Sequence, residues 1–96
     1  MYEIRFMKAA ERFLKKIKEK NLKAAFLVAL KKIADDPYMG ELKTGDLAGI
    51  YCYDVFYNHT NYEVAYQIFE EKDRLVIVLL AGTRENFYEE LKRYIK

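Results

Sequence analysis

The stretch that most constrains the fold of this chain runs from Arg74 to Tyr88 and reads RLVIVLLAGTRENFY. Its apolar run, Leu75 to Ala81, is uninterrupted and contains three β-branched residues. Such a run is typical of a strand buried on both faces, because a strand with one solvated face alternates polar and apolar side chains. The sequence therefore predicts a buried strand with Arg84 just beyond its end. A cation after a glycine that permits close backbone approach is suited to holding an anion.

Length and composition predict a single globular domain over residues 1–96. Such a chain buries roughly 60–70 % of its unfolded surface, and its nine tyrosines and six phenylalanines supply a core without disulfides. No apolar run approaches the ~20 residues of a membrane-spanning helix, and lysines interrupt every candidate signal peptide, so we expect a cytoplasmic protein with no membrane partner. With Cys52 and His59 the only residues of their types, we expect no metal and no cofactor.

Charge is distributed unevenly along the chain. Residues 1–34 carry ten lysines or arginines against three glutamates, and residues 35–96 carry seven against twelve acids. One interpretation is that the N-terminal part faces a polyanion or an acidic protein. The other is a lysine-rich helix face that is simply solvated, and the sequence leaves both open.

The N-terminal third predicts a strand followed by a helical hairpin. Residues Tyr2–Phe6 alternate polar and apolar side chains, as in a short strand at or near a sheet edge. From Met7 the apolar residues recur at helical spacing, and the pattern restarts after Lys20-Asn21. A link of about two residues makes the two helices nearly antiparallel. Asp35-Asp36-Pro37 ends the second helix, because proline cannot continue the hydrogen-bond ladder.

The rest of the chain predicts strands and a final helix. Residues 38–49 hold three of the four glycines and no clear period, which predicts a long irregular loop. Residues 50–57 and 62–69 alternate as strands joined by a four-residue link at 58–61, and a turn at 70–73 leads into the buried strand. Thr83 is the expected N-cap of a last helix that has acids early and basic residues late.

The resulting order, β-α-α-β-β-β-α, predicts the α+β class, with helices segregated from a three-stranded antiparallel meander. The first strand can join the sheet beside the last one, which would make residues 74–81 central. Alternation assigns the tyrosines at positions 51, 53, 62 and 66 to the core against the helices. The opposite face is then expected to be open, and it carries Cys52, Asp54, Glu63, Ala65 and Gln67.

Several short motifs follow one another over nearly the whole chain: the basic helical hairpin, Asp35-Asp36-Pro37, Leu47-Ala48-Gly49, the strand YEVAYQI at 62–68, and Gly82-Thr83-Arg84-Glu85 with an aromatic pair closely following. In order, spacing and total length these motifs resemble the RelE/ParE superfamily of bacterial toxin-antitoxin toxins. The resemblance implies a toxin neutralised by a cognate antitoxin, with operator DNA bound only by the toxin-antitoxin complex.

Two activities share this fold, so function must be argued from the site. The resemblance implies that RelE-like members are metal-independent endoribonucleases that cut messenger RNA in the ribosomal A site and so inhibit translation. ParE-like members instead inhibit DNA gyrase and cleave no RNA. We expect a messenger RNA endoribonuclease (an mRNA interferase). The alternatives are a ParE-like binding toxin and a degenerate toxin limited to antitoxin binding and co-repression.

Metal-free RNA cleavage needs a base for the 2′-hydroxyl, a cation for the phosphorane and a proton donor for the leaving oxygen. The resemblance implies that the arginine after the last strand holds the phosphate and that a tyrosine shortly after it stacks on a base or assists proton transfer. Arg84 and Tyr88 match these positions. Where RelE-like toxins place strand cations, this chain has Cys52, Asp54 and Glu63.

These acids allow two interpretations. Glu63 is the candidate general base, since the YoeB-like relatives use a glutamate with an arginine. Alternatively, Asp54 and Glu63 form a polar face that binds the antitoxin or another protein. His59 is expected to serve only the hairpin turn. Further candidate RNA contacts, including helix lysines that would dock on ribosomal RNA through phosphate contacts, are Lys43, Asp54, Asn86, Lys15, Lys16 and Lys23.

Overall fold

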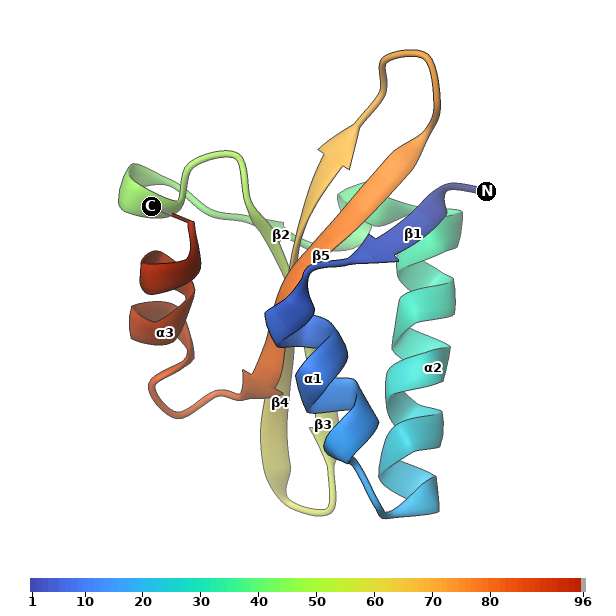
Figure 1. The fold of residues 1–96 in the computed structure, drawn as a ribbon, viewed down its shortest axis with the longest axis vertical. Helices are drawn as coiled ribbons and strands as arrows, with labels where there is room; N and C mark the ends of the chain where they lie inside the picture. Colours follow the sequence, from blue (N-terminus) through green and yellow to red (C-terminus); the bar gives the residue numbers. More distant parts are fainter. Residues whose placement is uncertain (96) are drawn as a thin grey trace.

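A five-stranded sheet with helices on both faces organises the molecule (Figure 1). The computed structural model describes residues 1–95. The helices are α1 (Lys8–Lys16), α2 (Lys20–Asp35) and α3 (Phe87–Tyr94), with short 3-10 turns η1 (Pro37–Met39) and η2 (Gly45–Leu47). The strands are β1 (Glu3–Phe6), β2 (Glu41–Leu42), β3 (Tyr51–Tyr57), β4 (Thr60–Phe69) and β5 (Leu75–Thr83). The α+β class is therefore confirmed. None of the described helices is long and apolar enough to cross a membrane.

The strand order is β1-β5-β4-β3-β2. As predicted, β1 lies at an edge beside the last strand, and it pairs parallel to β5 with Ile4 opposite Val76. The apolar run forms β5, which is interior, but the middle strand of the sheet is β4. The prediction that residues 74–81 are central is corrected in this respect, because β2 adds a strand at the other edge.

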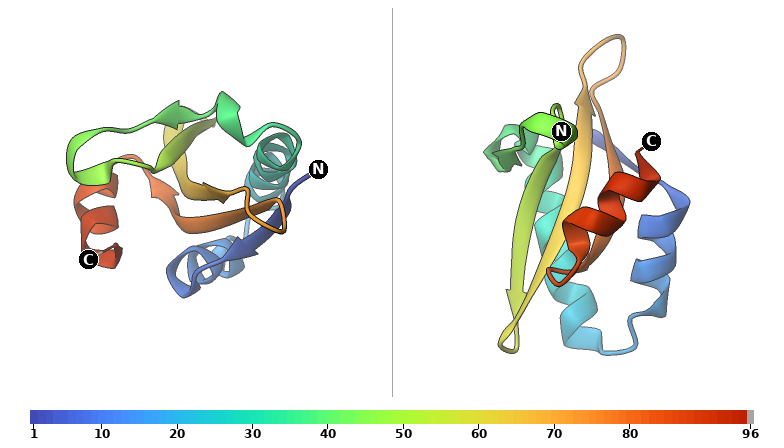
Figure 2. Two further views of the ribbon diagram at one scale, coloured as in Figure 1. Left: turned by 90° about the horizontal axis from the view of Figure 1, so that it is seen from above. Right: turned by 90° about the vertical axis from the view of Figure 1, so that its left-hand side faces the viewer.

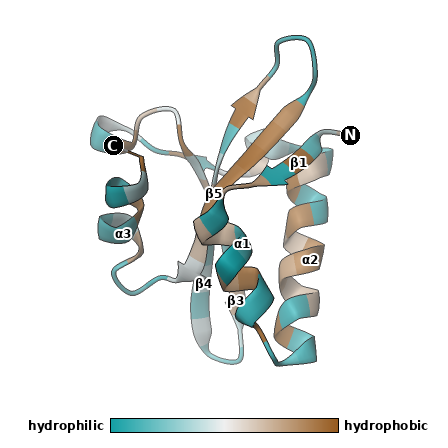
Figure 3. Ribbon diagram, viewed as in Figure 1, coloured by the Kyte–Doolittle hydropathy of each residue, from teal (hydrophilic) through white to brown (hydrophobic). Residues whose placement is uncertain are grey.

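The helical hairpin covers one face of the sheet (Figure 2). Phe26 of α2 is 1 % exposed and packs edge-on against Phe13 and Tyr62, with ring centroids 5.6 and 5.5 Å apart. Tyr66 is fully buried in the same cluster. The prediction that the tyrosine face packs against the helices is confirmed. Figure 3 shows the matching pattern, with a largely hydrophobic β5 behind an α1 that exposes hydrophilic residues.

The other face is not open, and that prediction is wrong. Helix α3 returns across the sheet and buries Phe87 and Leu91 against Cys52, Ala65 and Leu80. The amphipathic pattern of α3 was visible in the sequence, but its apolar side needs a surface to cover, and this face of the sheet is the surface it takes.

Three local predictions are also corrected. The loop at 38–49 contains β2, which pairs with β3 over only two residues and is too short to show alternation. The hairpin turn is the pair Asn58-His59, both in the left-handed region, because Thr60 and Asn61 belong to β4. Thr83 ends β5 opposite Tyr62, so the N-cap of α3 is Asn86.

Gly40 is placed where any side chain would collide with the core. The buried Tyr66 hydroxyl donates to the Pro37 carbonyl at 2.6 Å, and a Cβ on Gly40 would overlap that hydroxyl. Gly40→Ala is expected to lower the free energy of unfolding by about 1–3 kcal/mol, measured by urea denaturation. Gly82→Ala is the matched control, since Gly82 does not have a left-handed backbone and an added Cβ would meet Phe87 at an ordinary 3.9 Å. A smaller loss at Gly40 than at Gly82 would contradict the packing argument.

Candidate functional site

A buried carboxylate lies at the centre of the candidate site. Glu63 is 1 % exposed, although it sits among apolar residues in the middle of the sheet. The Tyr88 hydroxyl donates a hydrogen bond to Glu63 Oε1 at 2.7 Å. The Arg84 guanidinium Nε lies 3.4 Å from Glu63 Oε2, and the Arg84 side chain is 57 % exposed. The three residues predicted as catalytic therefore converge on one carboxyl group.

The end of β5 sets this arrangement. The backbone N–H of Arg84 donates to the Asn61 carbonyl at 2.9 Å, which fixes Arg84 beside the start of β4. Asn86 then adopts φ 60, and asparagine tolerates this left-handed conformation better than most residues. The Phe87 N–H donates back to the Arg84 carbonyl at 3.1 Å. This tight turn starts α3 at Phe87 and places Tyr88, the second residue of the helix, over Glu63.

Lys43 is the second cation of the site. Its ammonium lies 4.9 Å from the centre of the Tyr88 ring and 2.8 Å from Glu41 Oε1, and its side chain is 19 % exposed. Burial lowers the pKa of Lys43, but the Glu41 carboxylate and the Tyr88 hydroxyl more than offset this, so the pKa lies above its usual range. Glu41 was not predicted. The sequence signal for Glu41 was its position two residues before Lys43, because residues i and i+2 of a strand lie on the same face.

The surroundings keep the Tyr88 phenol and the Cys52 thiol protonated at neutral pH. Burial, followed by the hydrogen bond to Glu63, raises the pKa of Tyr88 to about 12. Burial also raises the pKa of the neighbouring Cys52 thiol to about 12. The site thus combines a neutral phenol with the buried carboxyl group of Glu63 and the exposed guanidinium of Arg84. Such a set can bind an anion and pass a proton between a bound hydroxyl and Glu63.

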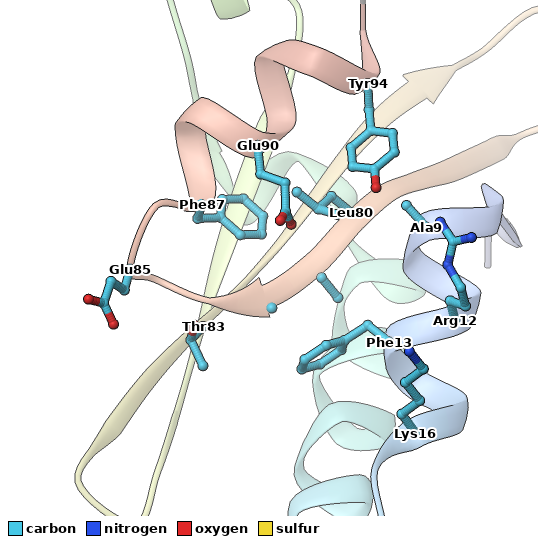
Figure 4. A pocket seen from close by; sticks show the side chains of 12 residues that line it. Ala9, Arg12, Phe13, Lys16, Leu80, Thr83, Glu85, Phe87, Glu90 and Tyr94 are labelled. Carbon is cyan, nitrogen blue, oxygen red and sulfur yellow. The ribbon is translucent and has the colours of Figure 1, made fainter.

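A separate cleft opens between α1 and α3 above β5 (Figure 4). It has a volume of about 370 Å³, with Arg12 and Lys16 on the α1 side and Glu85 and Glu90 on the other. Arg12 and Tyr94 also line an adjoining cavity of about 450 Å³. That cavity is walled by Phe6, Met7, Ala9, Lys8 and Leu79. This cleft could not be predicted from residue patterns, because it depends on how far α3 stands from α1.

Within residues 1–95 no group of three or more histidine, cysteine, aspartate or glutamate side chains is placed to hold a metal ion. Residues 4–92 match the family described as the ParE-like toxin of type II bacterial toxin-antitoxin systems. The chain belongs to this family. The superfamily resemblance found in the sequence is thereby confirmed, and the protein is a toxin of a toxin-antitoxin module. A comparison with curated proteins finds no significant match.

Solved structures of RelE toxins share the fold of this ParE-like toxin. The RelBE2 toxin-antitoxin complex from Mycobacterium tuberculosis aligns with a TM-score of 0.65 and 26 % identity over 86 % of this chain and 98 % of that one. A free E. coli RelE mutant aligns with a TM-score of 0.72 and 16 % identity over 97 % and 92 %. The same mutant bound to an antitoxin peptide gives 0.69 and 20 % over 93 % of each chain.

The remaining predicted site residues of the toxin lie outside the Glu63 cluster. Asp54 is the cross-strand neighbour of Glu63, but its side chain is exposed. Asn86 is exposed at the start of α3. The helix lysines Lys15, Lys16 and Lys23 are exposed on the helical hairpin, and Lys16 also lines the cleft between α1 and α3. His59 lies in the β3–β4 turn, as predicted.

Proposed function

We propose that this toxin is a metal-independent endoribonuclease that cuts messenger RNA in the ribosomal A site, in the cytoplasm. One observation carries the proposal: Arg84 and Tyr88 both contact Glu63, at 3.4 and 2.7 Å. A polar side chain as deeply buried as Glu63 is costly unless it is paired, and it is commonly retained for function. An exposed guanidinium beside it is suited to a phosphate.

Burial changes the role that Glu63 can take. Because its side chain is 1 % exposed, a ribose hydroxyl reaches it only through Tyr88. In the proposed step the Tyr88 oxygen accepts the 2′-hydroxyl proton while its own proton passes to Glu63. The 2′-oxygen attacks phosphorus, and the bond to the 5′-oxygen breaks. Arg84 neutralises the phosphorane, and water on the open side protonates the leaving oxygen.

The other predicted contacts position the RNA in this proposal. Lys43 is held by Glu41 beside the Tyr88 ring and adds positive charge next to the reacting phosphate. Asn86 and Asp54 are exposed near the cluster and are available for hydrogen bonds to ribose or base. Lys15, Lys16 and Lys23 would dock on ribosomal RNA, with a strength that falls as salt rises.

The cleft between α1 and α3 is the surface that best fits a cognate antitoxin. It joins an apolar cavity to a rim with basic residues on α1 and acidic residues on the other side. An amphipathic helix with complementary charges fits such a groove. The RelE complexes described above contain an antitoxin protein or an antitoxin peptide. Operator DNA would be bound only by the toxin-antitoxin complex.

Primer extension on messages translated during toxin induction tests the proposed activity. We expect discrete cuts linked to codon position. Tyr88→Phe should retain the fold and reduce cleavage at least about 100-fold, because it removes the shuttling hydroxyl. Tyr94→Phe is the matched control, since Tyr94 is an exposed tyrosine of the same helix that lies away from Glu63. Equal cleavage by Tyr88→Phe and the native toxin would exclude the proposed proton path.

One observation favours a ParE-like alternative, in which the toxin binds and inhibits DNA gyrase. Helix α3 covers the sheet face that carries Cys52 and Glu63, so little of that face is free to meet RNA. Intact messages together with a DNA-damage response during induction would support this alternative. Normal growth after induction would instead indicate a degenerate toxin limited to antitoxin binding and co-repression.

A further inference from the structure

One edge of the sheet is left unpaired over most of its length. Strand β2 pairs with β3 only at Tyr51 and Cys52. Residues 53–57 of β3 therefore have no neighbouring strand on their outer side in the part of the chain that the structure describes. Figure 2 shows this lower half of β3 at the margin of the fold, with α2 behind it.

The backbone groups that point outward from this edge can be assigned. In a hairpin with a two-residue turn, the flanking residues exchange both hydrogen bonds, here Tyr57 and Thr60. Alternation then turns the N–H and C=O of Asp54 and Phe56 away from β4. The hydrogen bond from the Lys43 N–H to the Ile50 carbonyl supports this assignment. Ile50 lies an even number of residues from Asp54 and Phe56, so its backbone groups face the same outer edge.

This edge lacks the features that usually protect one. Natural edges are blunted by lysines, prolines or bulges, whereas residues 53–57 carry one charge, Asp54, and are otherwise aromatic or aliphatic. Phe56 is 65 % exposed. A groove of about 290 Å³ runs between this edge and α2, where Val28 is 54 % exposed. Exposed apolar residues next to backbone N–H and C=O groups that no strand pairs indicate a surface for strand pairing.

We propose that the occupant of this edge is a second copy of the same chain, with the two β3 strands paired antiparallel about Val55. In that register Asp54 faces Phe56 of the second copy, so the outward N–H and C=O groups meet in both directions. Tyr53 faces Tyr57 of the second copy, an aromatic cross-strand pair. The sequence YDVFY is thus self-complementary, as a two-fold interface requires.

Charge also favours a second copy over a charged peptide. The groove is lined by one cation, Lys32, and one anion, Asp54. A strongly acidic or basic strand gains little from this balance, whereas two identical edges bring equal numbers of both charges. The exposed Val28 of α2 lines the groove beside the edge and loses water when a second α2 approaches.

The interface leaves the cluster of Arg84, Tyr88 and Glu63 and the cleft free, and Asp54 is the one proposed RNA contact that lies in the interface. Arg84 and the cleft lie at β5, and β4 separates β5 from β3. A dimer joined at β3 would therefore carry two accessible sites and bind two antitoxins at once. The proposal does not depend on whether the toxin cleaves RNA.

Sedimentation equilibrium of the purified toxin tests the proposal. We expect a concentration-dependent dimer of the 11.5 kDa chain. Phe56→Pro removes an outward N–H from each copy without touching the bonds to β4, and it should weaken dimerisation about 30-fold or more.

The control is Phe6→Pro on the β1 edge, where the bonds from Glu3 and Met7 to β5 show that the Phe6 N–H points outward. Phe6→Pro should leave the dimer unchanged.

A toxin that stays monomeric up to about 100 μM would overturn the proposal, because the dissociation constant of the dimer would then be too high for the dimer to matter. So would a Phe56→Pro variant that dimerises as tightly as the native chain, or a Phe6→Pro variant that dissociates equally. If Phe56→Pro does not fold, Val28→Asp decides, because Val28 is already exposed on α2. A folded Val28→Asp variant with an unchanged dimer would refute the β3 interface.

Discussion

Replacing Arg84 by alanine is expected to abolish growth arrest while the toxin stays folded. In the proposed reaction Arg84 is the cation that meets the phosphorane, and removing one such group typically costs about 10²–10³-fold in rate. The Arg84 side chain is 57 % exposed, but its partner Glu63 is 1 % exposed, so removing Arg84 leaves a buried carboxyl oxygen unpaired and is expected to cost about 1–3 kcal/mol of unfolding free energy, which a folded domain tolerates. Colony counts after induction measure toxicity, and thermal melting measures the fold.

Two companion variants make the result specific. Arg93→Ala removes an exposed arginine from α3 and should leave toxicity unchanged. Arg84→Lys keeps the charge but loses the planar guanidinium group, which can form bidentate hydrogen bonds to phosphate, so an intermediate toxicity is expected. Co-purification with the antitoxin should survive in all three. Full toxicity of a folded Arg84→Ala variant would remove the phosphate clamp from the mechanism and favour the gyrase-binding alternative.

Period-2 and period-3.6 patterns were sufficient to predict most of the fold. The tyrosines of β3 and β4 alternate strictly, so their shared burial against α2 followed from spacing alone. Strand β2 could not be predicted in this way, because its two residues pair by virtue of the turn that η2 makes beyond them. The N-cap of α3 was misplaced for a similar reason: Thr83 has cap chemistry, but its pairing with Tyr62 holds it in β5.

The candidate site was predicted in identity but not in arrangement. Resemblance indicated Arg84 and Tyr88, and alternation placed Glu63 on the same face as Cys52. That face was expected to be open, and the burial of Glu63 follows only from the packing of Phe87 and Leu91 above it. Long-range packing of this kind leaves no periodic trace in a single sequence. In the proposed reaction a buried Glu63 would therefore act through Tyr88 and not directly on the RNA.

Substitutions of Glu63 separate its structural role from its proposed chemical one. Glu63→Ala leaves a cavity in the sheet and takes the acceptor from the Tyr88 hydroxyl. The expected loss is about 3 kcal/mol of unfolding free energy, which lowers Tm by more than about 10 °C for a domain of this size. Glu63→Gln keeps the volume, and its amide oxygen can still accept from Tyr88, so its Tm should remain within a few degrees of native, about 1 kcal/mol or less.

Toxicity is expected to depend on the carboxyl group at position 63 and not on the stability of the variant. Glu63→Gln cannot take up the proton that Tyr88 passes on, so we expect it to be folded, bound by antitoxin and non-toxic. Combining it with Tyr88→Phe should cause little further loss, because residues that act as one unit are not additive. If Glu63→Gln arrests growth as strongly as the native toxin, Glu63 only holds α3 in place. The Arg84–Glu63 pair would then be a packing feature of a binding toxin, and gyrase inhibition would become the better proposal.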